Sequence, residues 1–161
     1  MNAQDLEKYI EEEGIRAELV FLEETTPTVE AAAAAVGVHP RQIGKSLLFM
    51  IKGDDGYRPL LVISNGLSRV GYKKLADYLG VSRKRVRIAS PQQVEAVTGY
   101  DVGTVPPFGH KQAVPTLLDE SVTALEEIYV GGGAINALLH LQVAELQRVL
   151  EAEVVDLSEE G

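Results

Sequence analysis

The chain of 161 residues contains no cysteine, which excludes disulfide bonds, thiolate metal sites and a cysteine nucleophile. It contains only three histidines, His39, His110 and His140, which are far apart and match no metal-ligand spacing. We therefore expect neither a metal ion nor another cofactor. No Ser/His/Asp order, nucleophile elbow or paired-carboxylate pattern stands out either. An enzyme built on this chain would depend on backbone amides, on its substrate or on water.

The sequence also lacks a long hydrophobic run. Its longest apolar stretches, such as SLLFMI at 46–51, are far too short to cross a bilayer, and residues 1–14 are acidic and amphipathic, unlike a signal peptide. No internal repeat, low-complexity linker or break in composition divides the chain. Hydrophobic residues make up 45% and charged residues 24%, so we expect one globular domain spanning residues 1–161, cytoplasmic and without a membrane partner.

Basic residues are scarce and unevenly distributed. The chain has 15 Lys and Arg against 24 Asp and Glu, and its net charge of −9 argues against general nucleic-acid binding. The segment from Arg69 to Arg87 nevertheless holds seven basic residues and a single acid, Asp77. Two interpretations stay open, an ordinary solvated face and a local phosphate-binding patch on an acidic body.

Hydrophobic periodicity and turn residues predict a mixed α/β fold with about eight strands and five helices. A largely closed, barrel-like mixed sheet with surrounding helices is expected. The helix signals include Pro27 at a first helical position, and Ser90 as a cap with Gln93 at the capping-box position. Asp55-Gly56 between two apolar runs predicts a hairpin. Helices are expected at 3–13, from Pro27 to a stop at Gly37, at 70–80, 90–98 and 143–150, and strands at 17–22, 45–51, 58–64, 85–88, 115–119, 126–130, 136–142 and 152–157.

Three motifs are candidates for a site. The loop TGYDVGTVPPFGHK at 98–111 is long for a connection and has few reactive side chains, which is typical of functional loops. GKS at 44–46 is not a nucleotide-binding P-loop, because His39 stands where that motif needs glycine and an apolar strand follows. Lys45 at the start of that strand is either an edge lysine or a site residue. The three glycines at 131–133 fit a tight turn better than a ligand contact.

These motifs, in this order, resemble the YbaK/ProX family of aminoacyl-tRNA deacylases, which is related to the editing domain of bacterial prolyl-tRNA synthetases. The resemblance runs from TPTVEAAAAAVG to AEVVDL and is most specific from TGYDVGTVPPFGHKQAVPTLLDES to EEIYVGGG. It implies a mixed α/β domain round a largely closed sheet. It also implies trans-editing, the hydrolysis of the aminoacyl ester of a mischarged tRNA.

The resemblance also implies site residues. Lys45 matches the family's site lysine and Ser46 lies beside it, while Gly103 and Pro107 belong to the loop that holds the aminoacyl group. We expect Lys45 and Gly103 to be catalytic, with Gly103, Gly109 and the 131–133 turn forming a cradle of backbone amides for the ester. The substrate-binding residues would be Ser46, Pro107, Gly109, His110, Gly131, Gly132 and Gly133. If the basic segment meets phosphates, the tRNA phosphate contacts would be Lys73, Lys74, Arg83 and Lys84.

The chain departs from the family at two places. Many members carry serine where Gly131 stands, and many carry an acidic residue in the following strand, where this chain reads NALLHL with His140. Two alternatives therefore stay open beside the deacylase: a non-catalytic module that binds tRNA or a synthetase, and a small-molecule binding domain on the same fold. The amino acid removed, the tRNA, the oligomeric state and a synthetase partner are not fixed by the sequence.

Overall fold

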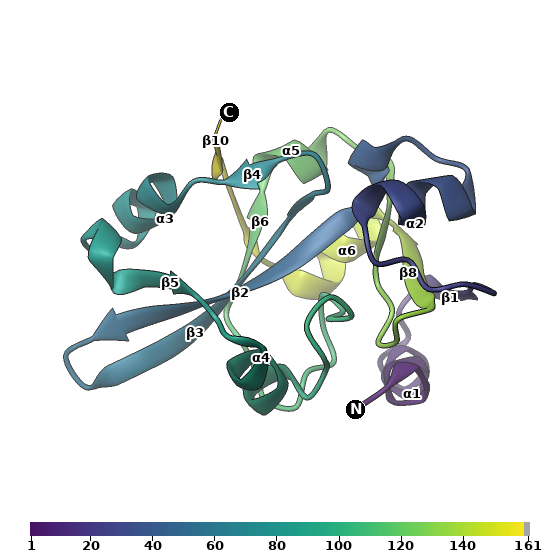
Figure 1. The fold of residues 1–161 in the computed structure, drawn as a ribbon, viewed down its shortest axis with the longest axis horizontal. Coiled ribbons are helices and arrows are strands. Elements are labelled where there is room, and N and C mark those ends of the chain that lie inside the picture. The colour runs from purple at the N-terminus through teal and green to yellow at the C-terminus, as the bar shows by residue number, and fades with distance from the viewer. Residues whose placement is uncertain (160–161) are drawn as a thin grey trace.

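The computed structural model describes residues 1–159 of the chain and shows a mixed α/β arrangement (Figure 1). The helices are α1 (Ala3–Glu13), α2 (Val29–Val36), α3 (Tyr72–Leu79), α4 (Pro91–Thr98), α5 (Glu120–Thr123) and α6 (Val143–Leu150), with short 3₁₀ turns η1 (Pro40–Gln42) and η2 (Arg83–Arg85). The strands are β1 (Ala17–Phe21), β2 (Gly44–Gly53), β3 (Gly56–Asn65), β4 (Arg69–Val70), β5 (Val86–Ile88), β6 (Thr116–Asp119), β7 (Glu127–Gly131), β8 (Ala137–Gln142), β9 (Glu153–Val155) and β10 (Ser158–Glu159).

The strands form three separate sheets. The largest has the order β5-β2-β3-β6-β9, in which β5, β2 and β3 are antiparallel and β3, β6 and β9 are parallel. A second sheet has the antiparallel order β1-β8-β7, and β10 pairs with β4. The expected barrel-like closure is wrong. Within residues 1–159, an isolated bridge between Ile43 and Tyr129 links the first two sheets. β2 and β7 therefore do not pair as neighbouring strands of one sheet.

Local sequence signals explain most element boundaries. The Ser90 side chain accepts a hydrogen bond from the Gln93 N–H at 3.2 Å, and the Gln93 side chain accepts one from the Ser90 N–H at 2.9 Å, as the capping box predicts. The hairpin is confirmed, with β2 and β3 paired from Gly53↔Gly56 to Gly44↔Asn65. Pro27 is not the first residue of its helix, because the Thr28 hydroxyl caps α2 by accepting from Ala31 N–H at 3.0 Å.

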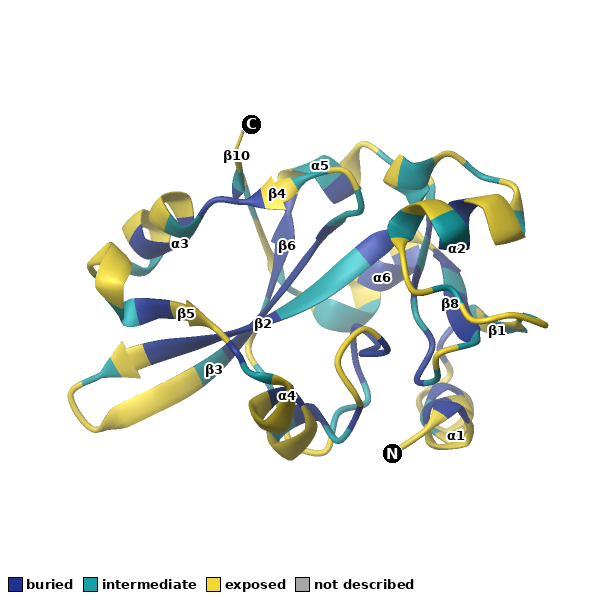
Figure 2. Ribbon diagram, in the orientation of Figure 1, coloured by how far each residue is buried: buried dark blue, intermediate teal, exposed yellow. Residues whose placement is uncertain are grey.

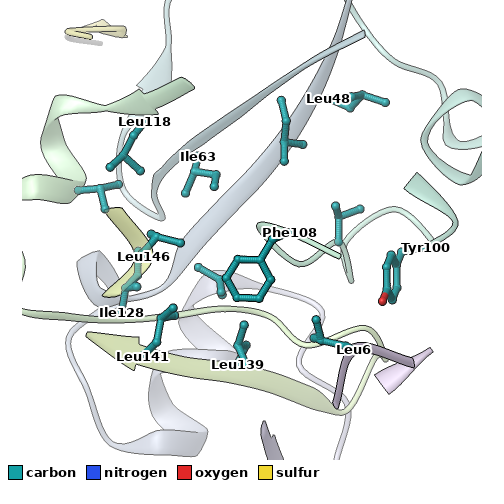
Figure 3. Close-up of a cluster of buried hydrophobic side chains, with 14 of the residues drawn as sticks. Leu6, Leu48, Ile63, Tyr100, Phe108, Leu118, Ile128, Leu139, Leu141 and Leu146 are labelled. Carbon is teal, nitrogen blue, oxygen red and sulfur yellow. The ribbon is translucent and has the colours of Figure 1, made fainter. Parts of the chain in front are cut away.

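The main core lies between the two larger sheets. Phe108, which comes from the long loop at 98–111, lies among side chains of β2–β3 and β7–β8 (Figure 3). Tyr100 from the same loop is fully buried. The loop is therefore held by two aromatic side chains in the core, although its backbone is irregular. Burial follows the middle of β2 and β3, whereas the far end of their hairpin is exposed (Figure 2).

The opposite face of the large sheet packs against α3 through a second cluster that includes Phe49, Val62 and Leu75. A small third cluster places α2 over the start of β2, where Ala32 and Ala33 pack with Ile43 and Leu138. The alanine-rich sequence of α2 permits this close approach, because alanine adds little bulk beyond the backbone. This packing places α2 over the start of β2, whose first residues pair with β3 along one edge.

Candidate functional site

A cavity of about 660 Å³ lies where α2, the start of β2, the long loop and the end of β7 meet. Segments far apart in the sequence form its walls, which is typical of ligand sites in mixed folds. Its lining consists of residues 25–29, Ala32, 43–47, 102–105, 130–131, 134–135 and 137–138. Four residues that the sequence singled out, Lys45, Ser46, Gly103 and Gly131, are among them.

The lining is mainly aliphatic, with hydroxyl groups from threonines and Ser46. Lys45 is its one charged side chain within residues 1–159, and none of the lining residues is Asp or Glu. A ligand that carries an ammonium group would therefore meet carbonyl and hydroxyl oxygens here rather than a carboxylate. The cavity is suited to a small, mostly uncharged group.

The edge of β2 that faces the cavity is open. β5 pairs with Phe49, Met50 and Ile51 of β2, and the last bond of this edge runs from the Ala89 N–H to the Leu48 carbonyl at 2.9 Å. In an antiparallel strand the N–H and C=O of one residue point to the same side, and the side alternates along the chain. Because the Leu48 carbonyl points to the β5 side, the N–H and C=O of Ser46 point there too, beyond the end of β5. Ser46 lines the cavity, and its backbone donor and acceptor lie on the part of the β2 edge that β5 does not cover.

Lys45 begins the same strand and is partly buried. Its ammonium donates a hydrogen bond to the Ser68 carbonyl at 2.7 Å, and it forms no ion pair with an Asp or Glu of residues 1–159. Burial lowers the pKa of Lys45. The structure thus holds a cation at the cavity without a counter-ion, oriented by one backbone carbonyl.

The Ser46 hydroxyl is buried and has no hydrogen-bond partner among residues 1–159. A buried hydroxyl without a partner is costly, so such groups often mark a ligand contact. The Ser64 hydroxyl, opposite Lys45 in the register, is also buried and without a partner in this part of the chain. Of these two, only the Ser46 hydroxyl belongs to the cavity lining and is therefore available to a ligand, whereas Ser64 is fully buried on the other face of the sheet.

Glycines bring the long loop onto β7. A Cβ on Gly131 would lie 2.8 Å from the carbonyl carbon of Val105 and 2.9 Å from that of Thr104, so the loop can pack here only against glycine. Gly103 has φ of +86° and open space around it, so it is required by backbone conformation instead. The Thr104 carbonyl accepts from the Gly133 N–H at 2.9 Å and joins the loop to the glycine turn.

The structure places the other five expected substrate-binding residues outside the lining. The His110 Nε2 donates to the Pro106 carbonyl at 2.7 Å, and burial lowers the pKa of His110 although this bond opposes the shift. Gly109 lies against the Tyr9 ring, and Gly132 against the Ala137 backbone. Pro107 is buried, and Gly133 packs near Ala3. These five residues do not belong to the cavity lining, and their placement fits a role in shaping its walls. Such packing depends on contacts that sequence spacing does not reveal.

The basic segment follows Ser68 directly, and several of its charges are already paired. Lys73 contacts Asp77 at 3.3 Å, and Lys74 contacts Asp156 at 3.1 Å and donates to the Ser158 carbonyl at 2.6 Å. The Arg83 guanidinium lies over the Tyr72 ring, 4.5 Å from its centre. Lys84 is exposed. A second hollow of about 440 Å³ is lined by Arg69, Val70, Tyr72, Lys73, Arg83 and Glu159.

Sequence reasoning missed part of the cavity. Thr25, Thr26 and Thr28 were assigned to a helix start, and Val102 and Ile135 have no reactive group that would mark them. Their shared feature is a position in loops beside the recognised motifs. Within residues 1–159 no cluster of three or more His, Asp or Glu could hold a metal ion, and no helix there is long and apolar enough to span a membrane.

Comparison with known proteins identifies a family for this arrangement. Residues 23–149 match the model of the aminoacyl-tRNA editing domain. The chain is 32% identical over 124 residues to YwhH of Bacillus subtilis (strain 168), covering 77% of this chain and 75% of that protein. It is 25% identical over 138 residues to the multifunctional Ser/Thr-tRNA deacylase ProXp-y of Escherichia coli (strain K12), covering 85% of this chain and 81% of that one.

A solved structure gives the same result. The crystal structure of a candidate trans-editing enzyme for prolyl tRNA synthetase superposes with a TM-score of 0.87 at 33% identity, covering 98% of this chain and 97% of that one. The family match covers most of the chain and includes the open edge of β2, the long loop and the glycine turn. This chain belongs to the family of aminoacyl-tRNA editing domains.

Proposed function

We propose that the protein is a trans-editing deacylase that hydrolyses the aminoacyl ester of a mischarged tRNA. The observation that carries the proposal is the cavity beside Lys45 in a chain of the editing-domain family. Among residues 1–159 its lining offers backbone groups and no Asp, Glu or Cys side chain. The related deacylase and the structural neighbour support the same reaction. An aminoacyl group fits the cavity by size and polarity, because its ammonium and carbonyl are its main polar groups.

The polar groups of the cavity match those of an aminoacyl ester. The open Ser46 carbonyl accepts from the α-ammonium, and the N–H groups of Ser46, Gly103 and Val105 donate to the ester carbonyl, since the Thr104 N–H already donates to the Asp101 carbonyl at 3.0 Å. A nucleophile adds to the carbonyl carbon, and these N–H groups stabilise the oxyanion that forms. The bond to the ribose oxygen then breaks, and the ribose oxygen takes up a proton. The nucleophile is water, activated directly or by a hydroxyl of the substrate.

Lys45 acts in this scheme by its charge. Its ammonium already donates to Ser68, and the lining offers no carboxylate within residues 1–159 to compete for it. It is suited to contact the terminal phosphate or ribose of the acceptor end, or to polarise the ester carbonyl. A lysine can act as a general base only when its ammonium has lost a proton, which requires a pKa far below the ordinary value. The scheme therefore uses Lys45 as a cation and not as a base.

The test of the proposed function is a panel of mischarged tRNAs assayed for deacylation with the wild-type protein and Lys45→Ala. We expect Lys45→Ala to keep its circular dichroism spectrum and to lose about 100-fold or more in rate, the scale of one lost oxyanion or positioning contact. Lys45→Arg should recover only part, because a planar guanidinium does not replace a compact ammonium. The matched control is Lys52→Ala, an exposed lysine on the same strand.

Near-wild-type activity of Lys45→Ala would remove Lys45 from the mechanism. A wild-type protein that binds mischarged tRNA but deacylates none of the panel would contradict the enzyme and leave the non-catalytic module. Equal losses in Lys45→Ala and Lys52→Ala would point to a general effect of charge rather than to the cavity.

The open edge of β2 has its own test. Ser46→Pro removes a backbone N–H that points away from β3, so the hydrogen bonds between β2 and β3 are kept. Proline is tolerated on edge strands for the same reason. We expect a loss of about 10²–10³ in kcat if this N–H stabilises the oxyanion. Ser46→Ala separates the backbone from the hydroxyl and should lose less. Equal rates for Ser46→Pro and Ser46→Ala, in folded proteins, would refute the role of the amide.

A further inference from the structure

Two of the three most exposed large apolar side chains within residues 1–159 line the cavity. Within residues 1–159, Ile135 is 65% exposed, Val102 58% and Leu67 57%, the three highest values for large hydrophobic residues. Ile135 and Val102 line the cavity, and Leu67 precedes Ser68, whose carbonyl receives the Lys45 ammonium. Single exposed apolar residues are ordinary, but two that line one cavity, with a third next to the residue that binds the Lys45 ammonium, indicate an interaction surface.

The backbone on both sides of the mouth is fixed, so these side chains are held in place. The Ile135 carbonyl accepts from the Thr26 N–H at 3.2 Å, and the Thr104 carbonyl, two residues after Val102, accepts from Gly133 at 2.9 Å. The Asn65 side chain accepts from the N–H groups of both Leu67, at 2.9 Å, and Ser68, at 2.8 Å. The three apolar side chains therefore project from ordered loops. Their exposure is not explained by a need to fill the core.

We propose that Ile135 and Val102 form an apolar rim that binds the terminal nucleobase of the tRNA, with Leu67 extending this surface toward Lys45. The inference rests on the proposed function and adds to it a partner for the mouth. If the aminoacyl group fills the cavity, the ribose to which it is bonded lies at the opening, and the base attached to that ribose lies against the rim. A nucleobase has two flat, weakly hydrated faces, which aliphatic side chains can cover.

Charge supports this division of the surface. Lys45 lines the cavity and donates to the Ser68 carbonyl, and the basic segment begins at the next residue, Arg69. Ile135 and Val102 carry no charge, and Lys45 is the only cation of the cavity lining among residues 1–159. Phosphates therefore find their partners on the Lys45 side, and the base finds an uncharged surface. The rim reads the presence of a stacked ring rather than its hydrogen-bonding edge.

The test compares two stable amide analogues of the substrate. The first joins the amino acid to 3′-amino-3′-deoxyadenosine, and the second is the methylamide of the same amino acid. Binding to the wild-type protein, Ile135→Ser, Val102→Ser and the double variant is measured by calorimetry. Ile88→Ser and Val154→Ser are the matched controls, because both residues are exposed aliphatic residues outside the cavity lining.

We expect the adenosine analogue to bind the wild-type protein more tightly than the methylamide. Each rim substitution should weaken the adenosine analogue by about tenfold, the scale of burying one aliphatic side chain, and should weaken the methylamide by a clearly smaller factor. The controls should change neither. In steady-state deacylation the same variants should raise KM for aminoacyl-tRNA by a larger factor than they raise KM for an amino-acid methyl ester.

Three results would overturn the rim. They are a wild-type protein for which adenosine adds no affinity, rim variants that bind both analogues equally less well, and controls that weaken binding as much as rim variants. Because the analogues report binding, failure of the rim is separate from failure of the deacylase. A protein that binds the adenosine analogue through the rim but hydrolyses no aminoacyl-tRNA would keep the rim and refute only the enzyme.

Discussion

Gly131→Ala should destabilise the protein and damage the site together. The new Cβ would lie 2.8 Å from the Val105 carbonyl carbon and 2.9 Å from the Thr104 carbonyl carbon, and would also contact the Val105 carbonyl oxygen. These are backbone atoms, so no side-chain rotation relieves the overlap and the loop must move. Overpacking of this kind costs about 1–3 kcal/mol. For a domain of this size we expect Tm to fall by about 2–12 °C, since each kcal/mol corresponds to about 2–4 °C.

The displaced segment carries Gly103 to Val105 of the cavity wall, so deacylation should fall as well. The assays are thermal unfolding and single-turnover deacylation at a temperature where both proteins are folded. Gly53→Ala is the matched control, because its Cβ would meet only the Gly56 carbonyl oxygen at an ordinary 3.5 Å. If Gly131→Ala is as stable and as active as Gly53→Ala, the close packing of the loop on β7 is not what this position requires. In that case, the family members that carry serine at this position could do so without a different loop conformation.

Other perturbations test separate parts of the structure. Reversing Lys73, Lys74, Arg83 and Lys84 to Glu should weaken aminoacyl-tRNA use more than methyl-ester hydrolysis, and low salt should enlarge the difference; equal losses would reject the patch. Lys74 should contribute least, because Asp156 and Ser158 already hold it. Gly103→Ala should cost about 1–2 kcal/mol, as unfolding would show, because its φ of +86° is strained for any side chain. Hydrogen bonds from the Arg148 side chain and the Arg16 N–H lower the pKa of Glu145 to about 2 from its ordinary 4.5. A lowered pKa in the folded state adds stability above the unfolded pKa, so the Tm difference between wild type and Glu145→Gln should shrink as pH falls from 4.5 toward 2. A difference that is constant with pH would show that this ionisation does not stabilise the fold.

Local signals in the sequence were enough for the elements that close over short distances. The capping box at Ser90 and Gln93 and the hairpin at Asp55-Gly56 depend on neighbours within a few residues, and the structure confirms both. The pairing of β4 with β10 joins Arg69 to Glu159, and two-residue strands carry no periodicity by which to find them. The expected closure of the sheet was wrong because it depends on contacts between distant segments. Whether β2 continues into β7 depends on packing around Ile43, not on the sequence of either strand.

The candidate site shows the same division. The family motif and the strand start pointed to Lys45 and Ser46, and both line the cavity. The motif could not separate Gly103, whose backbone faces the cavity, from Gly109, which lies against Tyr9. That difference is made by α1, which the long loop contacts only in the folded chain. Ile135 and Val102 were missed because their chemistry is ordinary and only their exposure distinguishes them.

The unbroken register of the β2–β3 hairpin has a consequence at both of its ends. A two-residue turn at Asp54 and Asp55 sets Gly53 opposite Gly56, and every pair up to Gly44 and Asn65 follows from it. A strand of this length spans about 33 Å, so the exposed turn lies far from the cavity. A shift of the β2–β3 pairing register by one residue would nevertheless exchange the two faces of β2. The groups of Lys45 and Ser46 would trade places, and Asn65 would no longer order the loop that receives Lys45. The length of this turn therefore helps to fix the positions of Lys45 and Ser46 at the cavity, although the turn itself lies at the other end of the hairpin.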